Sequence, residues 1–239
     1  MIRSYVIRNL KLSQTLETIY QRLTPLYAIE FRTDAGLDFR DIFGNPNPVV
    51  MEIGCGKGEA VIELAQANLA VNYLAIEVFK AGVAALLKKI EALGLHNVRV
   101  IQHNAVEIVE HMIPDRTLQG VHIFFPDPWP KQRHHKRRLV REPFVSLLTQ
   151  KLELNGYIHF VTDDLDYAKE AWVVFQNEPQ LKNNSSGFIQ ERPSWRPITK
   201  YEAKAKSLDR PIWEVSFSKL CQTVLKQKSF LWSDHHVNS

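Results

Sequence analysis

The chain has 239 residues, of which 45% are hydrophobic and 23% charged, so it is long enough to bury a sizeable core as one domain. Its formal net charge of +4 is only mildly basic, and the distribution of charge therefore matters more than the sum. Two cysteines exclude a disulfide scaffold, no apolar run approaches the ~20 residues of a membrane span, and the N-terminus lacks a signal-peptide pattern, so we expect a cytoplasmic protein without membrane contact.

The first 48 residues differ from those that follow. They carry scattered arginines and end in Gly-Asn-Pro-Asn-Pro, a composition that is typical of a loop. A regular pattern begins at residue 49, and after residue 220 no motif is recognisable. The sequence therefore predicts a basic, partly flexible leader (1–48), one domain (49–220) and a C-terminal tail (221–239).

Strand-like runs alternate with helical patterns from residue 49 onwards. The runs are rich in Val, Ile and aromatic residues, as buried parallel strands are, and lie at 49–53, 73–78, 98–102, 121–125 and 157–162. Helices are predicted at 80–93, where Gly94 is placed to end the helix, from Pro143 to near Asn155-Gly156, and at 165–175. The segments 188–193 and 213–219 are expected to add an antiparallel edge. This alternation predicts an α/β fold in which helices cover both faces of a parallel sheet.

A glycine-rich segment, EIGCGKGE, follows the first predicted strand directly. It lacks the Gly-Lys-Ser/Thr of a Walker loop, and Glu59 stands where a dinucleotide fingerprint has its third glycine. Gly54 and Gly56 let a ligand approach the backbone, while Glu52 makes the turn acidic and would repel phosphates. Glu77 ends the second strand, where a carboxylate can accept hydrogen bonds from ribose hydroxyls. A nucleoside with a cationic tail, S-adenosylmethionine, fits these residues; the alternative is a turn that uses glycine for packing alone.

Two further strand ends carry candidate site residues. Asn104 follows the third strand and either contacts the adenine edge or is a plain loop residue. The fourth strand leads into FFPDPWP, where prolines on both sides of Asp127 fix the backbone and lower the entropy of ordering the loop. An ionised carboxylate only accepts hydrogen bonds, and guanine offers paired N–H donors on its Watson–Crick edge. Asp127 would hold an unstacked guanine with ring nitrogen 7 toward the methyl donor, or else it merely caps the turn.

A strongly basic tract follows this acidic turn. Its side chains predict contacts with nucleic-acid phosphates, at Lys131, Arg133, Lys136, Arg137 and Arg138. Basic runs also occur on solvated faces and in targeting signals, and it is the adjacency to the predicted site that favours phosphate contact. Trp129 either stacks on a base or anchors the loop. The histidine pairs at 134–135 and 235–236 lack spaced partners, so they are predicted to be surface residues and no metal site is expected.

Two later segments add polar groups. Asp163 and Asp164 end the fifth strand, where one of them would cap the next helix and leave the other for substrate. The stretch from Thr199 to Glu202 offers hydrogen-bonding groups without periodicity, and by itself it would be read as a surface loop.

In this order, the motifs EIGCGKGE, IEV, FPDPWPKQRHHKRR, TD and TKYE closely resemble those of the bacterial tRNA (guanine-7-)-methyltransferases. The resemblance covers roughly residues 25–217, and the PDPWPK segment is its most specific part. It implies a Rossmann-like methyltransferase fold with a mostly parallel seven-stranded sheet. It also implies transfer of a methyl group from S-adenosylmethionine to a variable-loop guanosine of tRNA (position 46), which gives 7-methylguanosine.

The resemblance further implies roles for matching positions. Glu52, Glu77, Asn104 and Asp127 would line the cofactor site, with Asp127 as the catalytic residue. The residues that would meet the guanosine are Lys131, Asp163, Thr199, Lys200, Tyr201 and Glu202. We expect tRNA as the partner, no obligatory protein partner, and a monomer or homodimer.

The chain departs from the family pattern at two places. Relatives often have an aspartate at the position of Asn104, and they commonly have a glycine-containing turn after TKYE that is missing here. Two other functions compete with the one implied: methylation of a protein or small molecule, and RNA binding without catalysis. The basic tract argues against a small molecule, and the intact glycine loop and Asp127 argue against a non-catalytic module.

Overall fold

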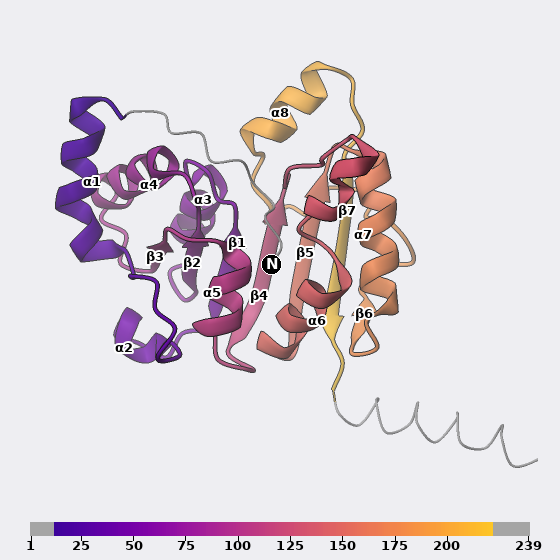
Figure 1. The fold of residues 1–239 in the computed structure, drawn as a ribbon, viewed down its shortest axis with the longest axis horizontal. Helices are drawn as coiled ribbons and strands as arrows, with labels where there is room; N and C mark the ends of the chain where they lie inside the picture. Colours follow the sequence, from indigo (N-terminus) through magenta and orange to yellow (C-terminus); the bar gives the residue numbers. More distant parts are fainter. Residues whose placement is uncertain (1–11, 222–239) are drawn as a thin grey trace, which may run out of the picture.

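The computed structural model describes residues 12–221; residues 1–11 and 222–239, and with them most of the predicted tail, lie outside this description (Figure 1). The described part contains one sheet of seven strands in the order β3-β2-β1-β4-β5-β7-β6. Strands β1 to β5 pair in parallel and β7 is antiparallel to both of its neighbours, which confirms the predicted mostly parallel sheet. The strands are β1 (Val49–Ile53), β2 (Asn72–Ile76), β3 (Val98–Ile101), β4 (Leu118–Phe124), β5 (Leu152–Thr162), β6 (Leu181–Asn183) and β7 (Trp213–Lys219).

Helices cover both faces of the sheet, as predicted, because each face carries its own apolar cluster. One face packs against α1 (Gln14–Tyr27), α3 (Glu59–Ala67) and α4 (Lys80–Ala92). The other face packs against α5 (Ala105–His111), α6 (Glu142–Lys151) and α7 (Leu165–Asn177).

Three further helices complete the described part of the chain. They are α2 (Phe39–Phe43), the 3-10 helix η1 (Gln132–Arg137) and α8 (Lys200–Ser207). Figure 1 shows α8 beyond the upper ends of β4 and β5. Among residues 12–221, every helix is too short or too polar to traverse a lipid bilayer.

The predicted end of α6 near Asn155-Gly156 is wrong. The helix ends at Lys151, and β5 begins at the next residue. Leu118 pairs with Leu152 and Gly120 with Tyr157, so the residues between them form an irregularity within the strand. Asn155 has a left-handed φ of 63°, and a Cβ at Gly156 would lie 2.9 Å from a backbone oxygen of Leu118. The Asn-Gly pair therefore marks a bulge in β5 rather than the end of a helix.

The antiparallel edge was predicted correctly at 213–219 and wrongly at 188–193. The strand that pairs with β7 at the edge is the short β6. Segment 188–193 runs beside β7, and Ile189 N donates a backbone hydrogen bond to Glu214 O at 2.8 Å. The segment does not form a strand, and its last residue, Pro193, has no N–H to donate to a neighbouring strand.

The described part of the leader, residues 12–48, carries α1 and α2, for which the sequence analysis assigned no element. Ser13 caps α1, and Leu23 in that helix is completely buried. Beyond the helix, Ile29 N donates to Val100 O in β3 at 2.8 Å. Within α1, the Tyr20 hydroxyl donates to Oε1 of Gln102, which follows β3, at 2.7 Å. This part of the leader therefore belongs to the core of the domain.

We expect Leu23→Ala to lower the free energy of unfolding by about 2–5 kcal/mol, because it leaves a cavity between α1 and the sheet. Leu26→Ala lies in the same helix at a side chain that is 62% exposed, and it should change stability by less than about 0.5 kcal/mol. Urea denaturation monitored by circular dichroism measures both values. Equal stabilities of the two variants would mean that α1 does not unfold together with the domain.

Candidate active site

The loops that follow the parallel strands meet at one edge of the sheet, where ligands of such folds bind. The loop after β1 turns sharply, since Gly54, Gly56 and Gly58 all have positive φ angles of 77°, 58° and 73°. A side chain at these positions would be strained, and Gly58 in addition serves as the N-cap of α3. The sequence thus exposes the backbone of a tight loop at the predicted cofactor position.

Glu77 holds this glycine loop in place from the end of β2. Its Oε2 accepts a bond from Gly56 N (2.8 Å), and its Oε1 accepts from Val78 N (2.7 Å) and Phe79 N (2.8 Å). Burial raises the pKa of the carboxyl, and these backbone bonds and the charge of Lys200 oppose that rise. The sequence analysis predicted Glu77 at this position but did not predict that it binds the glycine loop. A hydrogen bond from Glu77 to a ribose would be formed in addition to its three backbone hydrogen bonds.

Gly82, in α4, is a functional position that the sequence analysis missed. A Cβ there would lie 2.6 Å from Gly56 O and 3.1 Å from Glu77 Cγ. A glycine within a helix costs stability, so its presence in the first turn of α4 signals a close approach by another group. That is the one clue in the sequence that could have revealed how closely α4 backs the loop.

Glu52, at the end of β1, is a buried acid with one carboxyl oxygen that lacks a hydrogen-bond partner. The residue is 4% exposed, and its Oε2 has no hydrogen-bond partner. Burial, together with the negative charges of Glu59 and Glu77, raises its pKa to about 8. A buried carboxylate oxygen without a partner is costly, and a cation would relieve that cost. The residues present therefore fit the cationic tail of S-adenosylmethionine.

Asn104 lies beside this region as the N-cap of α5. It is buried, and its Oδ1 accepts a hydrogen bond from Val106 N at 2.9 Å. Capping the helix is a structural role that the sequence analysis did not predict, and the adenine contact stays a prediction.

The loop after β4 presents Asp127 at the same edge. Phe125 and Trp129, on either side of it, have left-handed φ angles of 50° and 48°. Asp127 is exposed, and its charge contributes with that of Glu77 to a raised pKa of Tyr201, whose main cause is burial. Asp127, Glu77 and Glu59 therefore all act electrostatically on Tyr201.

The stretch from Thr199 to Glu202 is the start of α8, so its interpretation as a surface loop is wrong. Thr199 Oγ1 accepts from Glu202 N (3.1 Å) and caps the helix. Glu202 is 1% exposed and pairs with Arg196 (2.6 Å) and Lys206 (2.9 Å). Thr199 and Glu202 thus hold the segment in position rather than facing solvent.

Lys200 and Tyr201 are the members of this stretch that face the site. Lys200 Nζ lies 3.9 Å from the place where a Cβ on Gly56 would be. Tyr201 is half exposed, and its ring stacks on Phe125 at a centroid distance of 6.3 Å.

Arg196, which the sequence analysis did not single out, anchors this segment to the sheet. Its guanidinium is fully buried and binds Glu214 of β7 through Nε (2.8 Å) and Nη2 (3.0 Å). Glu214 also contacts His159 Nε2 of β5 at 2.5 Å.

Asp164 is the one of the two acids after β5 that caps the next helix, and the substrate contact of Asp163 stays a prediction. Asp164 caps α7 by accepting from Tyr167 N at 2.8 Å. Asp163 is half-buried and pairs with the exposed Arg210 at 3.2 Å, so a substrate contact by Asp163 would compete with that pair.

The basic tract splits into exposed and buried members. Lys131, Arg133 and Lys136 are exposed, and Arg137 is half-buried with its guanidinium 4.3 Å from the Trp129 ring centroid. This contact favours the loop-anchoring alternative for Trp129. The structure contradicts the phosphate contact predicted for Arg138, because its side chain is 1% exposed and its nitrogens bind groups within the protein.

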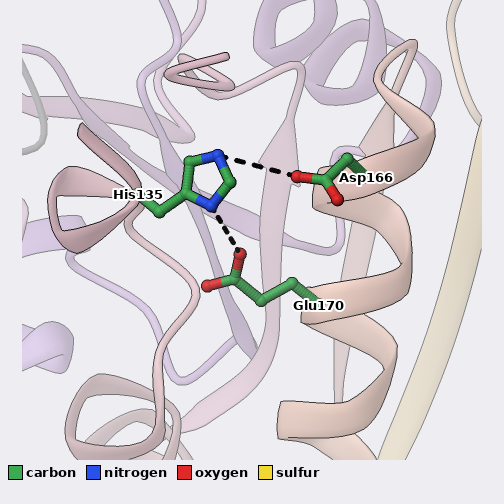
Figure 2. Close-up of side chains that lie close together, drawn as sticks. All are labelled: His135, Asp166 and Glu170. Carbon is green, nitrogen blue, oxygen red and sulfur yellow. Dashed lines mark ion pairs between the residues drawn. The ribbon is translucent and has the colours of Figure 1, made fainter. Parts of the chain in front are cut away.

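His135 was predicted to be a surface residue, but it is half-buried and faces two acids of α7 (Figure 2). Its Nε2 lies 3.7 Å from Asp166 and its Nδ1 lies 3.9 Å from Glu170. The three side chains could in principle hold a metal ion, since their ligand atoms lie within 4.8 Å of one another. However, the guanidinium of Arg138 binds both carboxylates, so their charge is already compensated.

Comparisons with known proteins agree with this geometry. Residues 46–215 match the family model described as a putative methyltransferase. A tRNA (guanine-N(7)-)-methyltransferase of Nitrosospira multiformis is 45% identical over 218 residues, which are 91% of this chain and 94% of the relative. One of Francisella tularensis is 43% identical over 92% of this chain and 95% of the relative. The crystal structure of the 16S rRNA methyltransferase KamB shares the fold with a TM-score of 0.57, at 13% identity over 82% of this chain and 99% of that one.

The raised pKa of Glu52 makes proton release a test of its role. At pH 7 a carboxyl with a pKa of about 8 is mostly protonated, and a bound cation favours its ionised form. We therefore expect binding of S-adenosylmethionine to release close to one proton, measurable by titration calorimetry in buffers of different ionisation enthalpy. Glu52→Gln should abolish this release and weaken binding, whereas Glu63→Gln, at an exposed position of α3, should change neither. Undiminished release from Glu52→Gln would assign the proton to another group.

Proposed function

Since the chain belongs to the family of the tRNA (guanine-N(7)-)-methyltransferases, we propose that it methylates ring nitrogen 7 of a variable-loop guanosine in tRNA. The observation that carries the proposal is the placement of Asp127 between an acidic, glycine-rich loop and an exposed basic tract. The inner part of the site is suited to a cationic nucleoside, and the outer part to a polyanion. We further propose that the enzyme works in the cytoplasm, as a monomer or homodimer, without an obligatory protein partner.

The cofactor of this reaction is S-adenosylmethionine, which supplies a methyl group on a positively charged sulfur. Glu52 offers its unmatched carboxylate oxygen to the cationic tail. Gly54 and Gly56 expose the backbone of the loop, and Glu77 would bind the ribose from the end of β2. Asn104, after β3, would bind the adenine.

Asp127 would orient the guanine by accepting the paired N–H donors of its Watson–Crick edge. Ring nitrogen 7 already carries a lone pair, so the chain need not supply a base to activate it. Catalysis then consists mainly of alignment, together with stabilisation of the positive charge that grows on the base. Lys131, Asp163, Lys200 and Tyr201 would complete the guanosine site, and Thr199 and Glu202 act there by fixing the start of α8.

Phosphate contacts fall to the exposed part of the tract: Lys131, Arg133, Lys136 and Arg137. The pKa of His134 is lowered by loss of hydration and by these four cations, which shows how densely positive charge gathers there. Such a surface binds nucleic acid largely by releasing counterions.

A methyl-transfer assay tests the function. The purified chain alone should transfer label from S-adenosylmethionine to bulk tRNA, and nuclease digestion should place the label in 7-methylguanosine. Label in another nucleoside, or labelling only of protein, would contradict the proposal. A requirement for an added protein factor would contradict the absence of an obligatory partner.

Asp127→Asn should slow the transfer step on the order of 10²-fold or more, because the amide cannot accept both N–H donors or offset the growing positive charge. Affinity for tRNA should fall little, since the phosphate contacts supply most of it. Single-turnover kinetics at saturating tRNA and cofactor measure the step. Asp34→Asn, at an exposed aspartate in the loop before α2, is the control and should be unchanged. A near-normal rate in Asp127→Asn would show that Asp127 only shapes its turn.

A further inference from the structure

Arg138 is among the largest fully buried side chains of the described residues, although it stands in a tract of exposed cations. Its Nε donates to the carbonyl oxygen of Pro128 at 2.9 Å. Its Nη2 donates to Asp166 at 2.8 Å, and its Nη1 donates to Glu170. The guanidinium also lies 4.9 Å from the ring centroid of Tyr167. One side chain thus joins the Asp127 loop to three residues of α7.

Three prolines limit the backbone hydrogen bonds that can hold the Asp127 loop. Residues 126, 128 and 130 are prolines, which have no N–H, so the loop can make few backbone bonds of its own. The left-handed φ angles of Phe125 and Trp129 are conformations that persist only when surrounding contacts impose them. On the strand side, Phe125 N donates to Val161 O at 2.8 Å. On the far side of Asp127, the bond from Arg138 to the Pro128 carbonyl restrains the loop, together with the contact of Arg137 with the Trp129 ring.

The anchor on α7 is close to the loop that follows β5. Asp164 caps that helix, and its Oδ1 lies 3.9 Å from Arg138 Nη2. Arg138 is therefore fixed to the same helix terminus that positions Asp163. His135 faces the same carboxylates from η1 (Figure 2). The buried guanidinium of Arg138 thus contacts both the loop that carries Asp127 and the loop that carries Asp163.

We propose that Arg138 is a positioning residue for methyl transfer, which sets the place of Asp127 through the Pro128 carbonyl and does not itself contact tRNA. The proposal rests on the function proposed above. A buried guanidinium needs its carboxylate partners, and the pairing leaves it no freedom to follow the substrate. A catalytic group displaced by about 1 Å can cost on the order of 10²-fold in rate, so a loosened loop should affect the transfer step more than binding.

The test compares Arg138→Lys and Arg138→Met with Arg137→Met in the full chain. Arg138→Met should lower the single-turnover rate at saturating tRNA and cofactor by about 10²-fold, while the tRNA dissociation constant and its salt dependence stay unchanged. Arg138→Lys, which keeps the charge but cannot reach all three partners, should fall between this variant and the wild type. Arg137→Met should instead reduce the log–log salt slope by about 0.7–0.9, as the loss of one phosphate contact does.

Added guanidinium ion gives a second readout that distinguishes positioning from general loss of structure. Millimolar guanidinium should restore part of the transfer rate of Arg138→Ala and should not change the rate of Asp127→Asn. If Arg138→Ala does not fold, Glu170→Gln, which weakens the same anchor from α7, should lower the transfer rate without changing the salt slope.

Three results would overturn the proposal: a normal transfer rate in Arg138→Met, a reduced salt slope in that variant, or a normal rate in Glu170→Gln when Arg138→Ala does not fold. An inactive wild-type chain would instead contradict the function proposed above, so the two failures can be told apart.

Discussion

Buried ion pairs and charged hydrogen bonds hold the loops of the candidate site in place. The loops at the carboxyl edge of the sheet are rich in glycine and proline, and such segments make few backbone bonds of their own. A buried charged side chain holds each of these segments through hydrogen bonds or ion pairs. Glu77 holds the glycine loop, Arg138 the Asp127 loop and Arg196 the start of α8. Removing a charge from water is expensive, and the cost is tolerated where it imposes a unique geometry.

Charge is layered across the site. Glu52 and Glu77 are buried in its interior, Glu59 is half-buried near them, and exposed cations lie on the loop outside. The net charge of +4 hides this separation, because acids and bases nearly cancel in the sum. An arrangement of this kind offers a negative surface to a small cation and a positive one to a polyanion, and each would be repelled from the place of the other.

Much of the fold could be predicted because the relevant signals are local in sequence. Buried parallel strands read as continuous apolar runs, and β1 was predicted to the residue. The glycine loop and the proline-flanked Asp127 carry their conformation in their residue types. Predictions failed where distant contacts decide the outcome. The Asn-Gly pair at 155–156 is a turn signal that the pairing of β4 with β5 converts into a bulge, and nothing near Arg138 or Glu202 in the sequence shows that they are buried.

Helix α1 bears on where this domain can be cut. Composition places a boundary near residue 48, yet α1 packs on α4, and Lys80 in the first turn of α4 pairs with Glu17 of α1 at 2.6 Å. Helix α4 in turn supports the glycine loop through Gly82. A shortened chain that starts at residue 49 would expose the outer surface of α4 to solvent and remove support from the wall behind the cofactor region. We therefore expect the minimal catalytic unit to extend well upstream of the first strand, even though the residues assigned to the chemistry lie in that strand or downstream of it.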